Sequence, residues 1–174
     1  MATWQTPPTK STGQNISISD WNALANNETF LYQKPYGLYY NTVAQAVANG
    51  NTTKIPLGGT TASGYGFSLS GGSIIVPLTG VYQVSFACVI STVSGSGANS
   101  FYSLAYHQSA AFAKGNTAPT YSTSAPVSAG SALVLCNAGD TLSLWLANNG
   151  GTGNTVTTVT NLLTYMHAVF IGSN

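Results

Sequence analysis

The sequence predicts an all-β domain over residues 36–174, preceded by an N-terminal arm and a short helix over residues 1–35. Two observations predict the β domain. After Tyr36, short runs of aromatic and β-branched residues are separated by turns of Gly, Ser, Asn and Pro. The same region shows no helical periodicity longer than two turns. About nine or ten strands at this spacing indicate a sandwich or barrel.

The first 17 residues are rich in Pro, Thr, Ser and Gln and lack periodicity, which indicates an extended arm. A helix is predicted over about residues 19–31. Ser17 or Ser19 can cap it, with Asp20 favourable near its positive end. It must end before Lys34-Pro35, because the residue before a proline avoids helical angles. A helix this short is not stable alone, so we expect its apolar residues to dock on another surface: Trp21, Leu24, Ala25, Phe30 and Leu31.

Alternation along the strands predicts the buried faces. In the run 80–91, one face holds Tyr82 and every second residue to Ile90, and in the run 140–148 one face holds Leu142, Leu144 and Leu146. Both runs also carry apolar residues on the second face. We therefore expect central strands that the core covers on one side and a neighbouring subunit covers on the other. Trp145 is a candidate anchor between subunits, and a partly covered surface tryptophan is the equal alternative.

Charge is scarce. Only 4% of the residues are charged, against about a quarter in an ordinary domain. A chain this poor in charge tends to self-associate, so we expect a permanent oligomer. The four lysines are scattered singly, which excludes a nucleic-acid partner. No run is long enough for membrane insertion, and the first residues do not resemble a secretion signal.

The two cysteines, Cys88 and Cys136, each lie in an apolar run, so we expect two reduced core thiols rather than a disulfide. They lack the His or acidic spacing of a metal site, and the three acids are too far apart for a calcium site. We expect no cofactor.

The stretch SIIVPLTGVYQVSFACVIS resembles the central signature of the tumour-necrosis-factor-like jelly roll, the family that includes the heads of complement's first component. LVLCNAGDTLSLWLAN is similar to its apolar strand, Gly-Asp turn and next strand, and MHAVFIGSN to its closing strand. The resemblance covers roughly residues 36–174. It implies ten strands in two sheets and a homotrimer whose axis is lined by apolar and aromatic residues. The candidates are Tyr39, Tyr102, Tyr106, Trp145 and Tyr165.

Residues 1–35 resemble the leaders of small structural proteins of tailed bacteriophages, through Trp4, Pro7-Pro8, the run 18–22 and Phe30-Leu31. This resemblance implies a protein of the virion surface, assembled in the bacterial host cytoplasm. The residues expected to anchor it to the particle are Trp4, Trp21, Leu24, Phe30 and Leu31.

Catalysis is not expected. The chain contains none of the Gly-x-Ser-x-Gly, His-Glu-x-x-His or phosphate-loop motifs. Asp140 follows a glycine and suits a structural turn. His107 and His167 are expected as polar groups of a surface or an interface, and the Gly-rich segment 148–154 as a flexible loop.

Two functions remain. In the first, trimers bind the capsid through residues 1–35 and reinforce it as a decoration protein, with the major capsid protein as partner. In the second, the trimer is a tail-fibre or tail-tip adhesin, held by tail proteins, that binds a host-surface carbohydrate. The candidate loops for the adhesin are residues 94–100, 114–124 and 148–155. Decoration is preferred, because no loop combines aromatic residues with acids.

Overall fold

The computed structural model describes residues 5–6, 9–32, 34–95, 99–120, 125–150 and 153–173. The chain divides into two compact units, Met1–Lys34 and Pro35–Asn174. Trp4, one of the expected anchoring residues, lies outside the described residues.

The first unit is a helix, α1 (Ile18–Tyr32), with the arm packed along it. The helix extends one residue beyond the prediction at each end. Ser17 is the cap: its backbone N–H donates to Asp20 Oδ2 at 2.7 Å, and the Asp20 N–H donates back to Ser17 Oγ at 3.3 Å. This reciprocal pair satisfies two backbone donors at the helix start. No helix in the described part of the chain has the length and apolar character to cross a membrane.

The arm is held to the helix by polar contacts. Lys10 Nζ lies 2.8 Å from Asp20 Oδ2, and Gln5 exchanges two hydrogen bonds of 2.7 Å with the Asn27 side chain. The bonds from Lys10 and Ser17 lower the pKa of Asp20 to about 2. The carboxylate therefore stays charged in any ordinary buffer.

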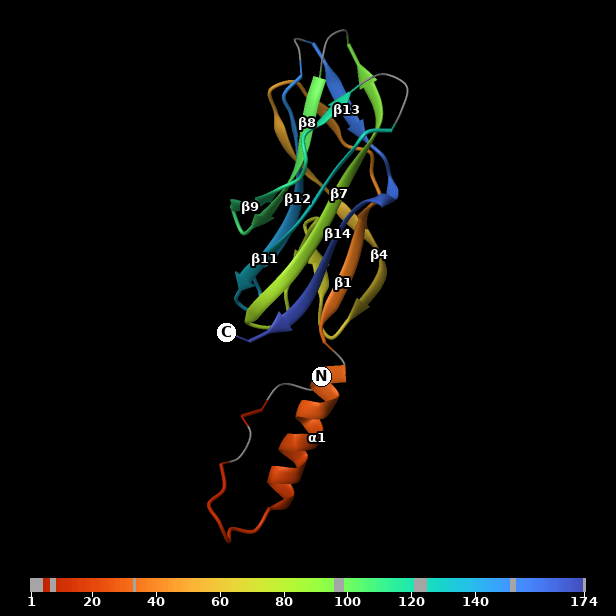
Figure 1. Ribbon diagram of the computed structural model, residues 1–174. Coiled ribbons are helices and arrows are strands. Elements are labelled where there is room, and N and C mark those ends of the chain that lie inside the picture. Colours follow the sequence, from red (N-terminus) through yellow and green to blue (C-terminus); the bar gives the residue numbers. More distant parts are fainter. Residues whose placement is uncertain are drawn as a thin grey trace. The chain divides into compact units, whose positions relative to one another are not determined.

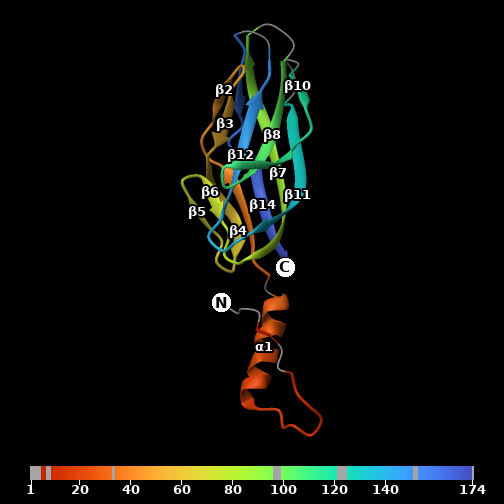
Figure 2. The ribbon, with the colours of Figure 1, turned by 90° about the vertical axis from the view of Figure 1, so that its left-hand side faces the viewer.

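The second unit is a sandwich of two antiparallel sheets (Figures 1 and 2). We call the first the β7 sheet. Its order is β2-β13-β7-β14-β1-β4, with β11 also paired to β7. Its strands are β1 (Tyr36–Asn41), β2 (Ala46–Ala48), β4 (Leu57–Gly64), β7 (Gly80–Ser94), β11 (Val127–Cys136), β13 (Thr155–Thr158) and β14 (Asn161–Gly172).

The second, the β12 sheet, has the order β10-β8-β12-β6-β5, with β3 paired to β12 and β9 paired to β8. Its strands are β3 (Thr52–Ile55), β5 (Ser68–Ser70), β6 (Ser73–Ile75), β8 (Asn99–His107), β9 (Ala110–Lys114), β10 (Ala118–Thr120) and β12 (Thr141–Asn148). The all-β jelly-roll prediction is confirmed. The described residues form fourteen strands rather than ten, and four of the fourteen are only three residues long: β2, β5, β6 and β10.

The core lies between the sheets and follows the predicted alternation. Tyr82, Val84, Phe86, Cys88 and Ile90 of β7 are all buried, and they face the buried Leu142, Leu144 and Leu146 of β12. On the second face of β12, Ser143 and Ala147 are also buried, within the subunit itself. The expected neighbouring subunit is therefore not needed to cover these two positions.

Both cysteines are buried and free, which confirms the prediction of two core thiols without a disulfide. Gly80, at the start of β7, fits a close approach of two strands. A Cβ atom at this position would overlap the Gly172 carbonyl oxygen and the Phe170 ring. Packing therefore requires glycine at this position, where the stretch SIIVPLTGVYQVSFACVIS enters strand β7.

Tyr82 closes the turn that precedes β7. Its hydroxyl donates to the Leu78 carbonyl at 2.8 Å and accepts from the Leu78 N–H at 3.2 Å, and its ring packs edge-on against Phe67 and Phe170. Burial raises the pKa of Tyr82 to about 12.

We expect Tyr82→Phe to lower the free energy of unfolding by about 1–3 kcal/mol, because the Leu78 backbone groups lose their partner while the ring packing remains. Chemical denaturation measures the loss. Tyr40→Phe, on the half-exposed outer side of β1, is the control and should leave stability within about 0.5 kcal/mol. Equal stability of Tyr82→Phe and the parent would contradict the assignment.

Candidate functional site

The outer face of the β7 sheet is apolar and lacks formal charge. The outward residues of β11 include Leu133 and Leu135, which are 65% and 51% exposed. One row of cross-strand neighbours crosses four strands of this sheet. It consists of Leu133 of β11, Gln83 of β7, Val169 of β14 and Tyr36 of β1. These four strands contain no Lys, Asp or Glu. Large apolar faces left exposed on a folded domain are commonly interaction surfaces, so this face is a candidate for one.

A groove of about 520 Å³ lies in this face, lined by Leu38, Thr61, Ser85, Leu162, Tyr165 and His167. Burial lowers the pKa of His167, so the imidazole is neutral at pH 7. The groove therefore offers a partner apolar surface with a few hydrogen-bonding groups and no charge to desolvate.

The β12 sheet carries an aromatic patch on its outer side. Tyr102 and Tyr106 of β8 and Trp145 of β12 are all partly exposed. The Tyr106 and Trp145 rings lie 4.9 Å apart at 33°, and the Trp145 indole N–H donates to Ser143 Oγ at 2.9 Å. Lys114 Nζ lies 3.9 Å from the centre of the Tyr102 ring. These contacts hold the rings in fixed positions.

The residues expected to line one trimer axis thus lie in three places. Tyr102, Tyr106 and Trp145 share the outer side of the β12 sheet, and Tyr165 lies on the outer face of the β7 sheet. Tyr39 is 2% exposed and packs in the core, so its expected place on a subunit surface is corrected. Every second residue of β1 points inward, and Tyr39 has the inward parity with its cross-strand partner Met166.

The helix residues expected to anchor the protein also divide between two faces. Trp21 is 60% exposed, and Leu24 and Leu31 are exposed as well, whereas Phe30 is buried. Phe30 follows Ala23 and Asn27 by seven and three residues, so it shares their buried face. Trp21, Leu24 and Leu31 form the free apolar surface of α1.

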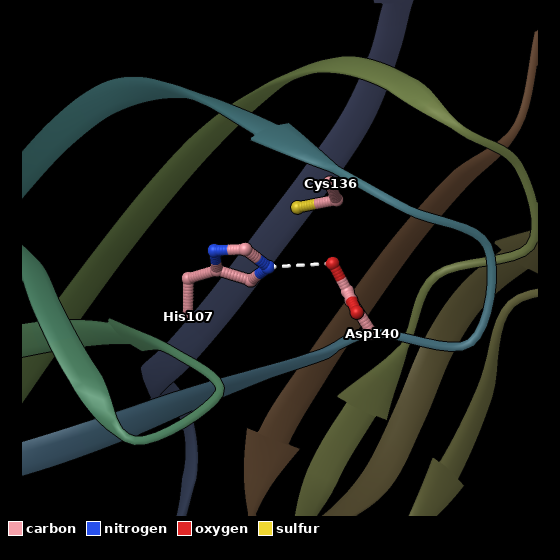
Figure 3. A group of neighbouring side chains, drawn as sticks. All are labelled: His107, Cys136 and Asp140. Atoms are coloured by element: carbon pink, nitrogen blue, oxygen red, sulfur yellow. Dashed lines mark hydrogen bonds and ion pairs between the residues drawn. The ribbon is translucent and has the colours of Figure 1, made fainter.

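A third feature was missed by sequence reasoning. His107, Cys136 and Asp140 each point one side-chain donor atom into the same small space, with these atoms within 4.8 Å of one another (Figure 3). His107 Nε2 lies 2.7 Å from Asp140 Oδ2. Pairing of β8 with β12, which sets His107 opposite Leu142, brings together residues that are far apart in the sequence.

Asp140 has the turn role that was predicted for it. Its Oδ2 accepts the Asn137 N–H at 2.7 Å, and its Oδ1 accepts from the Gln108 side chain. The bonds from Asn137, His107 and Gln108 lower the pKa of Asp140.

The cluster does not have the geometry of a cysteine-hydrolase triad. Asp140 engages Nε2, so the thiol would have to bond Nδ1, yet Figure 3 shows the Cys136 sulfur on the Nε2 side of the ring. Burial raises the pKa of Cys136 to about 12, with the charge of Asp140 as a further cause. The thiol is thus protonated and a poor nucleophile.

No family model and no curated protein matches the sequence. Solved structures do match the fold. Eiger TNF from S. frugiperda is similar at a TM-score of 0.54 and 13% identity, over 82% of this chain and 95% of that one. Murine APRIL at pH 8.0 is similar at a TM-score of 0.54 and 12% identity, over 80% of this chain and all of the other. The β domain therefore has the TNF-like jelly-roll fold.

Proposed function

We propose that this chain is a non-enzymatic structural protein of a tailed-bacteriophage virion. In this proposal it is a homotrimeric jelly roll on the particle surface, assembled in the host cytoplasm and anchored by residues 1–35, and it serves as a capsid decoration protein. The observation that supports the oligomeric part of the proposal is the uncharged, exposed apolar face of β1, β14, β7 and β11, and the virion role rests on the resemblance of residues 1–35 to phage leaders.

In the proposed trimer, a neighbouring subunit covers this apolar face. Leu133, Leu135 and Ile171 are exposed large apolar residues in a chain with 4% charge, and their exposure favours association. A stable interface buries about 800 Å² on each partner. A neighbouring copy seated in the groove at Tyr165 would cover the face and neutral His167 without burying a charge.

The N-terminal unit supports the anchoring role. A single capped helix of 15 residues has little stability of its own, and it presents Trp21, Leu24 and Leu31 to solvent. Docking these side chains on a capsid protein would stabilise the helix and the contact together. Three arms from one trimer would bind with avidity far above that of a single arm.

The alternative is a tail adhesin that binds a host-surface carbohydrate. The aromatic patch of Tyr102, Tyr106 and Trp145 favours it, because Tyr and Trp rings held in place offer an apolar surface with polar edges. Such a surface suits the stacking of a sugar ring.

Copy number tests the two roles. Quantitative mass spectrometry of purified virions from a host producing this chain should find hundreds of copies per particle if it decorates the capsid. A handful of copies would place it on the tail and favour the adhesin. Absence of the chain from purified virions would overturn the virion role altogether.

A further inference from the structure

The cluster of His107, Cys136 and Asp140 combines three donors that the backbone holds in place. His107 ends β8, Cys136 ends β11, and Asp140 closes the turn before β12. The turn is fixed by the Asp140 N–H, which donates to the Asn137 carbonyl at 3.0 Å, and by Gly139 at a φ of 89°. The Gln108 N–H donates to the Thr141 carbonyl at 2.9 Å and ties the end of β8 to the same place.

Cys136 is the unusual member. It is 1% exposed, and its thiol makes no hydrogen bond with any residue that the structure describes. Figure 3 shows its sulfur turned toward the space between the His107 ring and the Asp140 carboxylate. Cys88, the other buried thiol, is not part of such a group. Cys136 thus places a possible sulfur ligand beside an imidazole and a carboxylate.

The cluster is also open to solvent on one side. The side chains of His107 and Asp140 are 28% and 15% exposed, so an ion can reach the donors and a water molecule can complete its coordination. The Asn137 N–H and the Gln108 side chain already orient the Asp140 carboxylate. Such outer hydrogen bonds are what hold metal ligands in position.

We propose that His107 Nε2, Cys136 Sγ and Asp140 Oδ2 bind a zinc-class divalent metal ion, with water as the fourth ligand. The donors are nitrogen, sulfur and oxygen, a set that suits Zn²⁺, whereas Ca²⁺ and Mg²⁺ require oxygen donors. Ligand atoms around tetrahedral zinc lie about 3.3–3.7 Å apart, given the usual bond lengths. For the ion to bind, the His107–Asp140 contact of 2.7 Å must open and the sulfur, which lies within 4.8 Å of both donor atoms, must move inward by side-chain rotation.

Binding has a defined proton balance. The Cys136 thiol gives up its proton to solvent and binds as the thiolate, and His107 binds through Nε2 with its proton on Nδ1. The ion would join the ends of β8 and β11 to the turn before β12, so its binding would stabilise the folded domain.

Cobalt binding to the full-length protein tests the site. Chelator-treated protein titrated with Co²⁺ should develop a thiolate-to-cobalt charge-transfer band and tetrahedral visible bands, saturating at one ion per chain. Zn²⁺ should displace the cobalt and raise the unfolding temperature. Absence of the charge-transfer band at millimolar Co²⁺ would overturn the proposal.

Matched variants locate the ligands. Cys136→Ser should abolish the charge-transfer band, and His107→Gln and Asp140→Asn should weaken cobalt binding at least tenfold. Cys88→Ser, which changes the other buried thiol, should leave the spectrum unchanged. If Cys136→Ser fails to fold, the His107→Gln variant, at a partly exposed position, provides the test. Cobalt affinity equal to that of the parent, with an unchanged circular dichroism spectrum, would overturn the site.

Discussion

Replacing Leu133 and Leu135 together by glutamate is expected to dissociate the proposed trimer into monomers. Both side chains are more than half exposed on the outer face of β11, so the variant loses none of its own core. In a trimer the change places six carboxylates against apolar surface without a counter-charge. Even about 4 kcal/mol of unpaired-charge cost raises the dissociation constant about a thousandfold.

Size-exclusion chromatography with light scattering measures the result. Val43→Glu, which charges another exposed apolar residue in the loop between β1 and β2, is the control and should remain trimeric. A trimer that survives the double substitution would show that another surface forms the interface. A monomeric parent protein would remove the trimer from the proposed function.

On the proposed function, substituting Trp21, Leu24 and Leu31 by alanine is expected to prevent incorporation into virions while the β domain stays folded and keeps its oligomeric state. The three side chains are exposed, so their loss costs the isolated protein little. On the particle, the same change would remove the apolar contact of all three arms, and the avidity would fall with each arm. We expect occupancy below about a tenth of the parent level, because losing about 1.4 kcal/mol of binding free energy already weakens binding tenfold.

Occupancy is measured by quantitative mass spectrometry of purified virions. Deletion of residues 1–34 is the companion variant. It keeps Pro35, whose carbonyl accepts the Phe170 N–H at 2.9 Å. Glu28→Gln, on an exposed polar position of α1, should be incorporated normally. Full occupancy of either the triple variant or the deletion would contradict the anchoring role of the arm.

Local patterns predicted the parts of the structure that depend on neighbouring residues. The helix was placed to within a residue at each end, because a local cap at Ser17 and Asp20 sets its start and the Lys34-Pro35 pair limits its end. The core face of β7 followed from strict alternation between Tyr82 and Ile90. The burial of both cysteines followed from the apolar runs that contain them.

The residues that form the candidate surfaces could not be predicted locally, because strand pairing determines which side chains are exposed. Alternation assigns residues to two faces of a strand, but it does not say which face meets the core when both carry aromatic residues. In the run YGLYY, inward Tyr39 and outward Tyr40 look equivalent until β1 is paired with β14. The five aromatic residues expected around one axis were separated for this reason.

The sequence by itself determined an all-β domain with an N-terminal helix and few charged residues, because composition, alternation and capping are local properties, and its resemblance to a known family implied the jelly roll. Only the tertiary structure decided which apolar residues remain exposed at Leu133, Leu135 and Tyr165. It also brought His107 to Cys136 and Asp140. Both outcomes depend on strand register, since the pairing of distant strands determines which side chains share a face and which donors meet.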